Sequence, residues 1–240
     1  MAPSSASSAA SSSQLLFDVE PFRSEPRRVV MAREVAHPTL VLGSTQPAEV
    51  VAPLALRARS AELVRRRGGG GAVYLEPGNH LWLDAWIPRD DDLWVHDVSV
   101  AAEWAGRWWV GALGGLGAER ASFSVHTGRS VPGRYGELVC FAGRGPGEVF
   151  DGRSKVVGLS QWRCREGALF SSCAYVAWEP GPLLEVLELG GGSFEDELAG
   201  ELSGAAVGLG QLLPPSVDLS SVRARLVGSF PEFVMGAGGA

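Results

Sequence analysis

The sequence predicts an α+β domain built on a mixed sheet, and two patterns support this prediction. Strand-like segments outnumber helical ones in the middle of the chain, and the two kinds do not alternate regularly. A regular alternation would favour a doubly wound parallel sheet instead. Apolar residues make up 45% of the 240 residues, enough for a substantial core. We therefore expect residues 15–240 to form one domain after a disordered Ser/Ala-rich tail at 1–14.

The first predicted strands surround a run of glycines. Residues 39–43 are a short apolar strand candidate. Pro47 suits the first turn of a helix, and Pro53 makes that helix short, kinked or delayed. The segment AELVRRRGGGGAVYLEPGNHLWLDAWIP, residues 61–88, then predicts strand, glycine loop, strand, turn and strand. Residues 81–87 alternate well enough for a half-buried strand.

The clearest helix is predicted over residues 96–115, where apolar side chains recur at three- and four-residue spacing. A hairpin is predicted at Asp151-Gly152, a pair typical of two-residue turns. Strands are predicted near 121–126, 137–142, 147–150, 154–161 and 168–177. Helical pieces follow at 182–189, 194–202 and 218–229, broken by Gly and Pro.

Composition and charge exclude several classes of function. The net charge of −6 argues against a general nucleic-acid surface. Three cysteines without a CxxC pair and four scattered histidines suggest neither a disulfide framework nor a metal site. The N-terminus has no apolar signal region, and no run approaches a membrane span. We therefore expect a soluble, cytoplasmic protein with no nucleic-acid or membrane partner.

Three arginines, residues 65–67, precede four glycines, residues 68–71. Glycines let a backbone approach a ligand closely and turn successive N–H groups inward, and neighbouring arginines can hold phosphate or carboxylate. The alternative is a flexible hairpin loop flanked by solvated arginines. Neither a GxGxxG helix start nor a Walker sequence is present, which excludes the usual nucleotide loops.

Lys155 is the only lysine, since the other twenty cationic side chains are arginines. In a regularly pleated strand it shares a face with Val157 and Leu159, which favours an ammonium in a pocket. The alternative is a lysine at a sheet edge that extends into solvent. A strand edge would tolerate arginine equally well, so the pocket is the better interpretation.

Cys140 is the candidate nucleophile. The predicted hairpin brings strands 137–142, 147–150 and 154–161 together, so that Lys155 could lower the pKa of the Cys140 thiol. The alternative is a small buried apolar residue, as most free cysteines are. Cys164 and Cys173 have no evident partner, and we interpret both as structural.

Three motifs carry a resemblance to a known family. RRRGGGGAVYLEPGN at 65–79 resembles the RRxSGGGAVxxxxGN signature of lipoate–protein ligases and octanoyltransferases. GRSKVVGLSQWRCR at 152–165 resembles that family's GxKxxGSAQxR signature, and PTLVLGSTQ at 38–46 is similar to its PxxxxGxxQ segment. The motifs occur in the family's order. The resemblance implies a biotin protein ligase-like catalytic domain with a largely antiparallel mixed sheet and flanking helices.

The resemblance also implies roles for residues. Lys155 would contact the acyl carbonyl, and apolar strand residues nearby would line a tunnel for an eight-carbon chain. The other residues implied in holding the activated acyl group are Arg66, Gly69, Gly70, Gly71, Ala72, Val73, Tyr74, Asn79 and Gly158.

Two chemistries are known for this family. An octanoyltransferase moves an acyl group from acyl carrier protein onto a cysteine and then onto a lysine of an acceptor domain, without a cofactor. A ligase uses ATP and Mg²⁺ to form a lipoyl-adenylate first. One branch of the family carries a Cys-Phe pair fifteen residues before the lysine, and Cys140-Phe141 matches that placement. The implied acceptors are lipoyl domains of 2-oxo acid dehydrogenase complexes or the glycine cleavage H protein.

The chain departs from the family pattern at several positions. Gly68 replaces the serine of RRxSGGG, and Ser172-Cys173 stands near the family's HG pair. We therefore predict an enzyme of protein lipoylation that uses a Cys140 thioester, with Lys155 polarising the acyl carbonyl. The alternatives are the ATP-dependent ligase and a pseudoenzyme that binds an acyl group or an acceptor without turnover.

Overall fold

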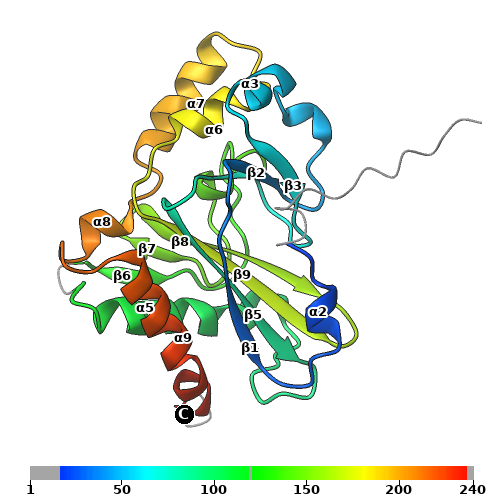
Figure 1. The fold of residues 1–240 in the computed structure, drawn as a ribbon, viewed down its shortest axis with the longest axis vertical. Helices are drawn as coiled ribbons and strands as arrows, with labels where there is room; N and C mark the ends of the chain where they lie inside the picture. The colour runs from blue at the N-terminus through cyan, green and yellow to red at the C-terminus, as the bar shows by residue number, and fades with distance from the viewer. Residues whose placement is uncertain (1–16, 119–120, 237–240) are drawn as a thin grey trace, which may run out of the picture.

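The computed structural model describes residues 17–118 and 121–236, with side chains up to residue 230. The predicted tail at 1–14 lies outside the described residues. Figure 1 shows a large sheet at the centre, two long helices beside its lower half, and a smaller sheet with short helices at the upper end. No helix in the described residues combines the length and apolar character needed to cross a membrane.

In the described part of the chain, six strands form one sheet whose neighbours all pair antiparallel. In spatial order they are β1 (Val29–Arg33), β5 (His80–Pro88), β9 (Gly167–Tyr175), β8 (Ser154–Arg163), β7 (Val149–Asp151) and β6 (Phe123–Val125). The predicted Asp151-Gly152 turn joins β7 to β8, and Gly152 has a φ of +58° that favours glycine.

A second sheet of three described strands has the order β3 (Glu62–Arg65), β2 (Thr39–Leu42) and β4 (Val73–Leu75). β2 pairs parallel with β3 and antiparallel with β4. The predicted α+β class with a mixed, largely antiparallel sheet is therefore confirmed. The glycine loop is the connection from β3 to β4, as the sequence predicts.

Helices cover both sheets. α5 (Glu103–Gly114) and α9 (Leu219–Gly236) lie side by side against the large sheet (Figure 1). At the opposite end, α3 (Pro53–Ala58), α6 (Gly181–Glu185) and α7 (Ser193–Ser203) lie over the small sheet (Figure 1). Short helical elements complete the described chain: α2 (Glu20–Arg23), η1 (Ala48–Val50), α4 (Val98–Ala101), η2 (Cys140–Ala142) and α8 (Leu209–Leu212).

The largest core lies between the large sheet and the helices α5 and α9. Trp104, Trp108 and Phe230 form a ring cluster there, with centroids 5.2–6.3 Å apart. β5 is buried along its whole length, where a half-buried strand was predicted. The reason is that Trp82 and Trp86 pack in separate clusters with Phe17 and with Phe22 respectively, on the other side of the strand.

Two predicted elements differ in the structure. The helix predicted over 96–115 is divided at Ala102 into α4 and α5. The strand predicted over 137–142 is wrong: Val139 makes a single bridge to Ala72, and the 3₁₀ turn η2 follows. The Ala72 N–H donates to the Leu138 carbonyl, and the Cys140 N–H donates to the Ala72 carbonyl. The segment 137–142 therefore pairs with the chain at Ala72 alone and then turns.

Replacing Trp109 tests the main core. Its side chain is fully buried and its indole N–H donates to Ser172 Oγ at 2.9 Å. We expect Trp109→Ala to lower the free energy of unfolding by about 3–5 kcal/mol, measured by urea denaturation. Leu54→Ala is the control, because Leu54 is 79% exposed, and it should change stability by less than about 0.5 kcal/mol. Equal effects of the two substitutions would contradict this description of the core.

Candidate active site

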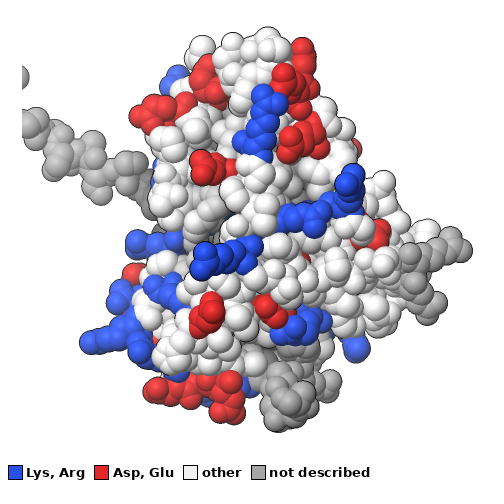
Figure 2. All heavy atoms as spheres, turned by 180° about the vertical axis from the view of Figure 1, so that it is seen from behind, with Lys and Arg blue, Asp and Glu red and all other residues white. Residues whose placement is uncertain are grey.

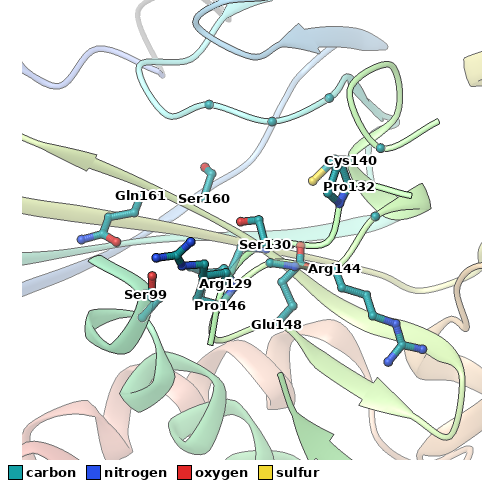
Figure 3. Close-up of a pocket in the computed structure, with 18 of the residues that line it drawn as sticks. Ser99, Arg129, Ser130, Pro132, Cys140, Arg144, Pro146, Glu148, Ser160 and Gln161 are labelled. Atoms are coloured by element: carbon teal, nitrogen blue, oxygen red, sulfur yellow. Dashed lines mark hydrogen bonds between the residues drawn. The ribbon is translucent and has the colours of Figure 1, made fainter. Parts of the chain in front are cut away.

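A cavity of about 530 Å³ opens between the glycine loop, α4, the segment 129–148 and β8 (Figure 3). Gly69, Gly70 and Gly71 line it together with Cys140, Glu148 and Lys155. The sequence-predicted loop, thiol and lysine therefore meet at one place. In Figure 3 the Cys140 sulfur points toward the side on which Ser160 and Gln161 lie.

Two glycines have no room for a side chain: Gly43, which follows β2 and lies against the glycine loop, and Gly71 within the loop. A Cβ on Gly43 would collide with the carbonyl oxygen of Gly70, and a Cβ on Gly71 would lie 2.6 Å from main-chain atoms of Val139. Gly70 also has a φ of +92°, which side chains rarely adopt. Gly71 thus brings the loop backbone against the segment that carries Cys140, and Gly43 brings the end of β2 against the loop.

Gln46 fixes the Cys140 segment from another side, against the turn that follows β2. Its buried side-chain oxygen accepts from the Gly43 N–H at 2.9 Å. Its amide nitrogen donates to the carbonyls of Glu137 and Leu138 at 3.1 and 3.0 Å. The last residue of the first motif, PTLVLGSTQ, therefore joins the turn after β2 to the segment before Cys140.

Arg66 does not face the cavity. It is 4% exposed and donates to the carbonyls of Gly69 and Gly71 at 2.7 and 2.9 Å. Burial lowers the pKa of this guanidinium. Arg66 thus holds the glycine loop by two hydrogen bonds, and it also lines a narrow slot beside Cys140. Its contact with a carboxyl or phosphate end stays a prediction.

Lys155 is fully buried, although it carries a charge. Its ammonium donates to the Cys140 main-chain carbonyl at 2.6 Å and to the Glu148 carboxylate at 2.8 Å. The register of β7 and β8 shifts next to Lys155, so the pleat is not regular. Consequently Leu159 lines the cavity with Lys155, whereas Val157 packs in the main core and does not share the predicted face.

The Cys140 thiol is not activated at rest. Burial raises its pKa above the ordinary value of a cysteine, and the carboxylate of Glu148 adds to this rise. Lys155 and Arg66 act in the opposite direction but do not outweigh burial. Lys155 therefore lowers the pKa of Cys140 as expected in sign, yet the net shift is upward, because burial of the thiol outweighs the ammonium.

A narrow slot extends from the cavity beside the thiol. Val73, Trp82, Gly158 and Cys173 line it with Cys140, and its free volume is about 10 Å³. A Cβ on Gly158 would lie 3.5 Å from the Cys140 sulfur, so this glycine leaves the space beside the thiol open. Cys173 is buried, and burial raises the pKa of its thiol above the ordinary range, which fits the structural role predicted for it.

Three of the sequence-predicted binding residues lie away from the cavity. Ala72 and Tyr74 belong to the core beneath the small sheet. Asn79 donates to the Ala177 carbonyl and accepts from its N–H, which ties the β4–β5 turn to the end of β9. Val73 and Gly158 contact the slot, and the glycines from 69 to 71 contact the cavity.

The sequence reasoning missed Glu148 and Arg129. Glu148 stands seven residues before Lys155 in GEVFDGRSK, and a carboxylate next to a predicted hairpin was the available signal. In Figure 3 the guanidinium of Arg129 lies among the lining side chains, whereas that of Arg144 points away from them. Arg144 instead stacks on Phe150, with its guanidinium carbon 4.5 Å from the ring centroid.

No group of three or more His, Cys, Asp or Glu side chains suited to a metal ion occurs among the described residues. Of the carboxylates, Glu137 and Glu148 line the cavity, and Glu148 is engaged by Lys155. The residues that the structure describes therefore offer no preformed metal cage. A phosphate-bound Mg²⁺ needs few protein ligands, so this arrangement does not conflict with a magnesium nucleotide.

The family model described as the lipoyl protein ligase A/B catalytic domain matches residues 15–231. No curated protein sequence matches the chain. Similar solved structures include a bi-partite lipoate protein ligase from Thermoplasma acidophilum, studied with its E2 lipoyl domain. It is 20% identical, with 92% of this chain and 78% of that chain covered and a TM-score of 0.72.

Two further structures have the same fold. The T. acidophilum protein Ta0514 with bound lipoic acid is 20% identical, with 92% and 79% of the two chains covered and a TM-score of 0.68. A lipoate-protein ligase A bound with ATP is 19% identical, with 92% and 79% covered and a TM-score of 0.65. At these identities the likeness concerns the fold.

The close packing of the loop can be tested with two glycines. We expect Gly71→Ala to lower the free energy of unfolding by about 1–3 kcal/mol, because its Cβ has no room against Val139. Gly69→Ala is the matched control, since no atom lies within 4 Å of its Cβ position. Thermal denaturation of both variants measures the difference. Equal melting temperatures would show that the loop is not packed as described.

Proposed function

The chain belongs to the lipoyl protein ligase A/B catalytic domain family, and from this premise we propose that it transfers an octanoyl or lipoyl group to a lysine of a lipoyl acceptor domain through a thioester on Cys140. One observation carries the proposal. The Cys140 thiol lines the cavity, and the ammonium of Lys155 donates to the carbonyl of that same residue.

In the first step the Cys140 sulfur attacks the carbonyl carbon of an acyl thioester. A C–S bond forms to Cys140, the bond to the donor sulfur breaks, and the donor leaves as a thiol. Lys155 has three N–H groups, of which the Cys140 carbonyl and Glu148 take one each. The third is available to the acyl carbonyl, where a fixed ammonium stabilises the developing oxyanion.

The glycine loop supplies further donors. Gly69, Gly70 and Gly71 line the cavity with their backbone, and no side chain separates their amides from a ligand. Amides fixed in this way stabilise negative charge on a reacting carbonyl oxygen. In the second step the acceptor lysine amine attacks the thioester carbonyl, an amide forms, and Cys140 is released.

The slot beside Cys140 is the proposed place for the acyl chain. Its lining is largely apolar, and burying an eight-carbon chain contributes about 0.8 kcal/mol per methylene. The slot is too narrow for such a chain as it stands, so the chain must displace slot side chains as it enters. Trp82 is the bulkiest of them, and it is held by a hydrogen bond of 3.0 Å to Asp84.

The second candidate is the ATP-dependent ligase, which would form a lipoyl-adenylate. Arg129, Ser130 and the glycine loop line the wide part of the cavity, where they would hold phosphate oxygens of ATP with its Mg²⁺. The similar ligase A structure with bound ATP favours this alternative. Transfer from a thioester donor would require neither ATP nor Mg²⁺.

We further propose lipoyl domains of 2-oxo acid dehydrogenase complexes or the glycine cleavage H protein as acceptors, and acyl carrier protein as donor. The similar bi-partite ligase was studied with an E2 lipoyl domain. Figure 2 shows Arg side chains in a band across the middle of one face, with acidic groups above and below. Such a band would attract a negatively charged partner protein despite the net charge of −6.

Intact mass spectrometry tests the thioester. After incubation with octanoyl-acyl carrier protein, we expect the mass of the chain to rise by one octanoyl group, and hydroxylamine to remove it. Cys140→Ser should abolish this hydroxylamine-sensitive adduct, because no thioester can form. Cys164→Ser is the matched control and should retain it. An adduct that persists in Cys140→Ser and resists hydroxylamine would contradict the proposal.

Lys155→Arg should lower transfer to a lipoyl domain by at least about 100-fold, because a planar guanidinium cannot replace a compact ammonium enclosed by two acceptors. Circular dichroism should show that the fold survives.

A parallel incubation with lipoate and ATP, in which pyrophosphate release is measured, tests the ligase. Normal turnover of Cys140→Ala in that assay would exclude the transferase and support the ligase.

A further inference from the structure

The slot beside Cys140 crosses three neighbouring strands of the large sheet. Cys173 of β9 pairs directly with Gly158 of β8 on one side and with Trp82 of β5 on the other. Residues that are paired in this way point to the same face of an antiparallel sheet. Gly158, Cys173 and Trp82 therefore form a row across the sheet, and all three line the slot together with Cys140.

This row begins at the thiol. The Cβ position of Gly158 lies 3.5 Å from the Cys140 sulfur, so an acyl group on this sulfur starts above the glycine. The side chains then increase in size along the row, from the hydrogen of Gly158 through the thiol of Cys173 to the indole of Trp82. A chain that extends from the sulfur along the slot thus crosses two small residues before it meets a large one.

The Trp82 side chain is held in place from two sides. Its indole N–H donates to the Asp84 carboxylate at 3.0 Å, and its ring meets the Phe17 ring edge-on, with the centroids 4.9 Å apart. The Asp84 carboxylate is itself fixed by Arg33 at 2.9 Å and by the Ser171 hydroxyl at 2.6 Å. Trp82 is 2% exposed, so it has no open solvent into which its ring could turn.

Leu159 is placed differently. It is half-buried and lines both the wide cavity and the slot, so its side chain has open space beside it. An acyl chain can therefore enter the slot by displacing Leu159 into the cavity. Trp82 has no such space, and it stays where Asp84 and Phe17 hold it.

We propose that Trp82 closes the far end of the slot and sets the longest acyl chain that Cys140 accepts, a role in specificity that rests on the proposed transfer through Cys140. Neighbouring strands lie about 4.8 Å apart, so the row from Gly158 to Trp82 spans about 10 Å. An extended chain of about eight carbons, joined by zigzag bonds of about 1.5 Å, covers a similar distance. Acyl groups of medium length therefore fit between the sulfur and the indole, and longer ones meet the ring.

Coenzyme A thioesters of hexanoate, octanoate, decanoate and dodecanoate test this limit. Single-turnover acylation of Cys140, followed by intact mass, gives a second-order rate constant for each chain. In the wild type this constant should rise about fourfold per methylene up to octanoyl, and it should fall for decanoyl and dodecanoyl. In Trp82→Ala the maximum should move to decanoyl or beyond, and the ratio of dodecanoyl to octanoyl should rise at least about 50-fold.

Trp86→Ala is the matched control. Trp86 is a second buried tryptophan on the same face of β5, but it packs against Phe22 and lies outside the slot. Its removal should leave the chain-length profile of the wild type, even where the rate or the stability is lower. Cys173→Leu is the reciprocal variant: a larger side chain in the middle of the row should move the maximum to hexanoyl.

Trp82→Phe keeps the inference testable if Trp82→Ala does not fold, which circular dichroism and thermal denaturation check. Phenylalanine keeps a ring against Phe17 but is smaller and offers no N–H to Asp84. The ratio of decanoyl to octanoyl should rise at least about fivefold in this variant. An unchanged ratio in the folded Trp82 variants would overturn the inference. A shift of equal size in Trp86→Ala would also overturn it, because general loosening of the core would then be the cause.

Binding of the free fatty acids to the same variants, measured by calorimetry, separates this inference from the proposed function. If no thioester forms on Cys140, yet octanoate binds and Trp82→Ala moves the strongest binding to longer acids, only the transfer reaction fails. If the wild type is acylated and every variant keeps its profile, only the role of Trp82 is overturned. If the wild type neither reacts with these thioesters nor binds these acids, both proposals are overturned.

Discussion

The site depends on one buried ammonium. Lys155 is withdrawn completely from solvent, a position that a charge can occupy only with partners at close range. Its partners are the main chain of Cys140, which belongs to a turn, and the carboxylate of Glu148, which precedes the neighbouring strand. The ammonium therefore fixes the turn, the strand and the cavity wall relative to one another. The fully buried position also explains why a chain with twenty arginines keeps a single lysine here, since a guanidinium would need more space and more acceptors.

The opposite wall of the cavity is fixed by backbone contacts instead of charge. Gly71 lies directly against Val139, and Gln46 bridges the first motif to the carbonyls before Cys140. Arg66 donates to two loop carbonyls and holds the loop from below. A loop of four glycines would otherwise be the most mobile part of the chain. Here the loop is fixed in place, because close packing at Gly71 joins it to the segment that carries the thiol and Arg66 holds its carbonyls.

The ion pair has a consequence for reactivity. Burial raises the pKa of the Cys140 thiol more than the ammonium of Lys155 lowers it, and the Glu148 carboxylate adds to the rise, so the thiol stays protonated. Such a thiol is protected from oxidants and adventitious electrophiles at rest.

The sequence by itself determined the α+β class, the strand–glycine loop–strand unit, the hairpin at Asp151-Gly152 and the meeting of Lys155 with Cys140. These features follow from local patterns: apolar alternation, turn residues and motif spacing. Tertiary structure alone decided that 137–142 is a turn, that Arg66 supports the loop from inside, and that Glu148 pairs with Lys155. Each of these depends on contacts between residues far apart in the chain or across a strand bulge. A polar side chain such as that of Arg66 bonds to whichever oxygen atom lies nearest to it in space. The sequence does not give the distances between such atoms, so it does not show whether the side chain contacts a ligand or a main-chain carbonyl.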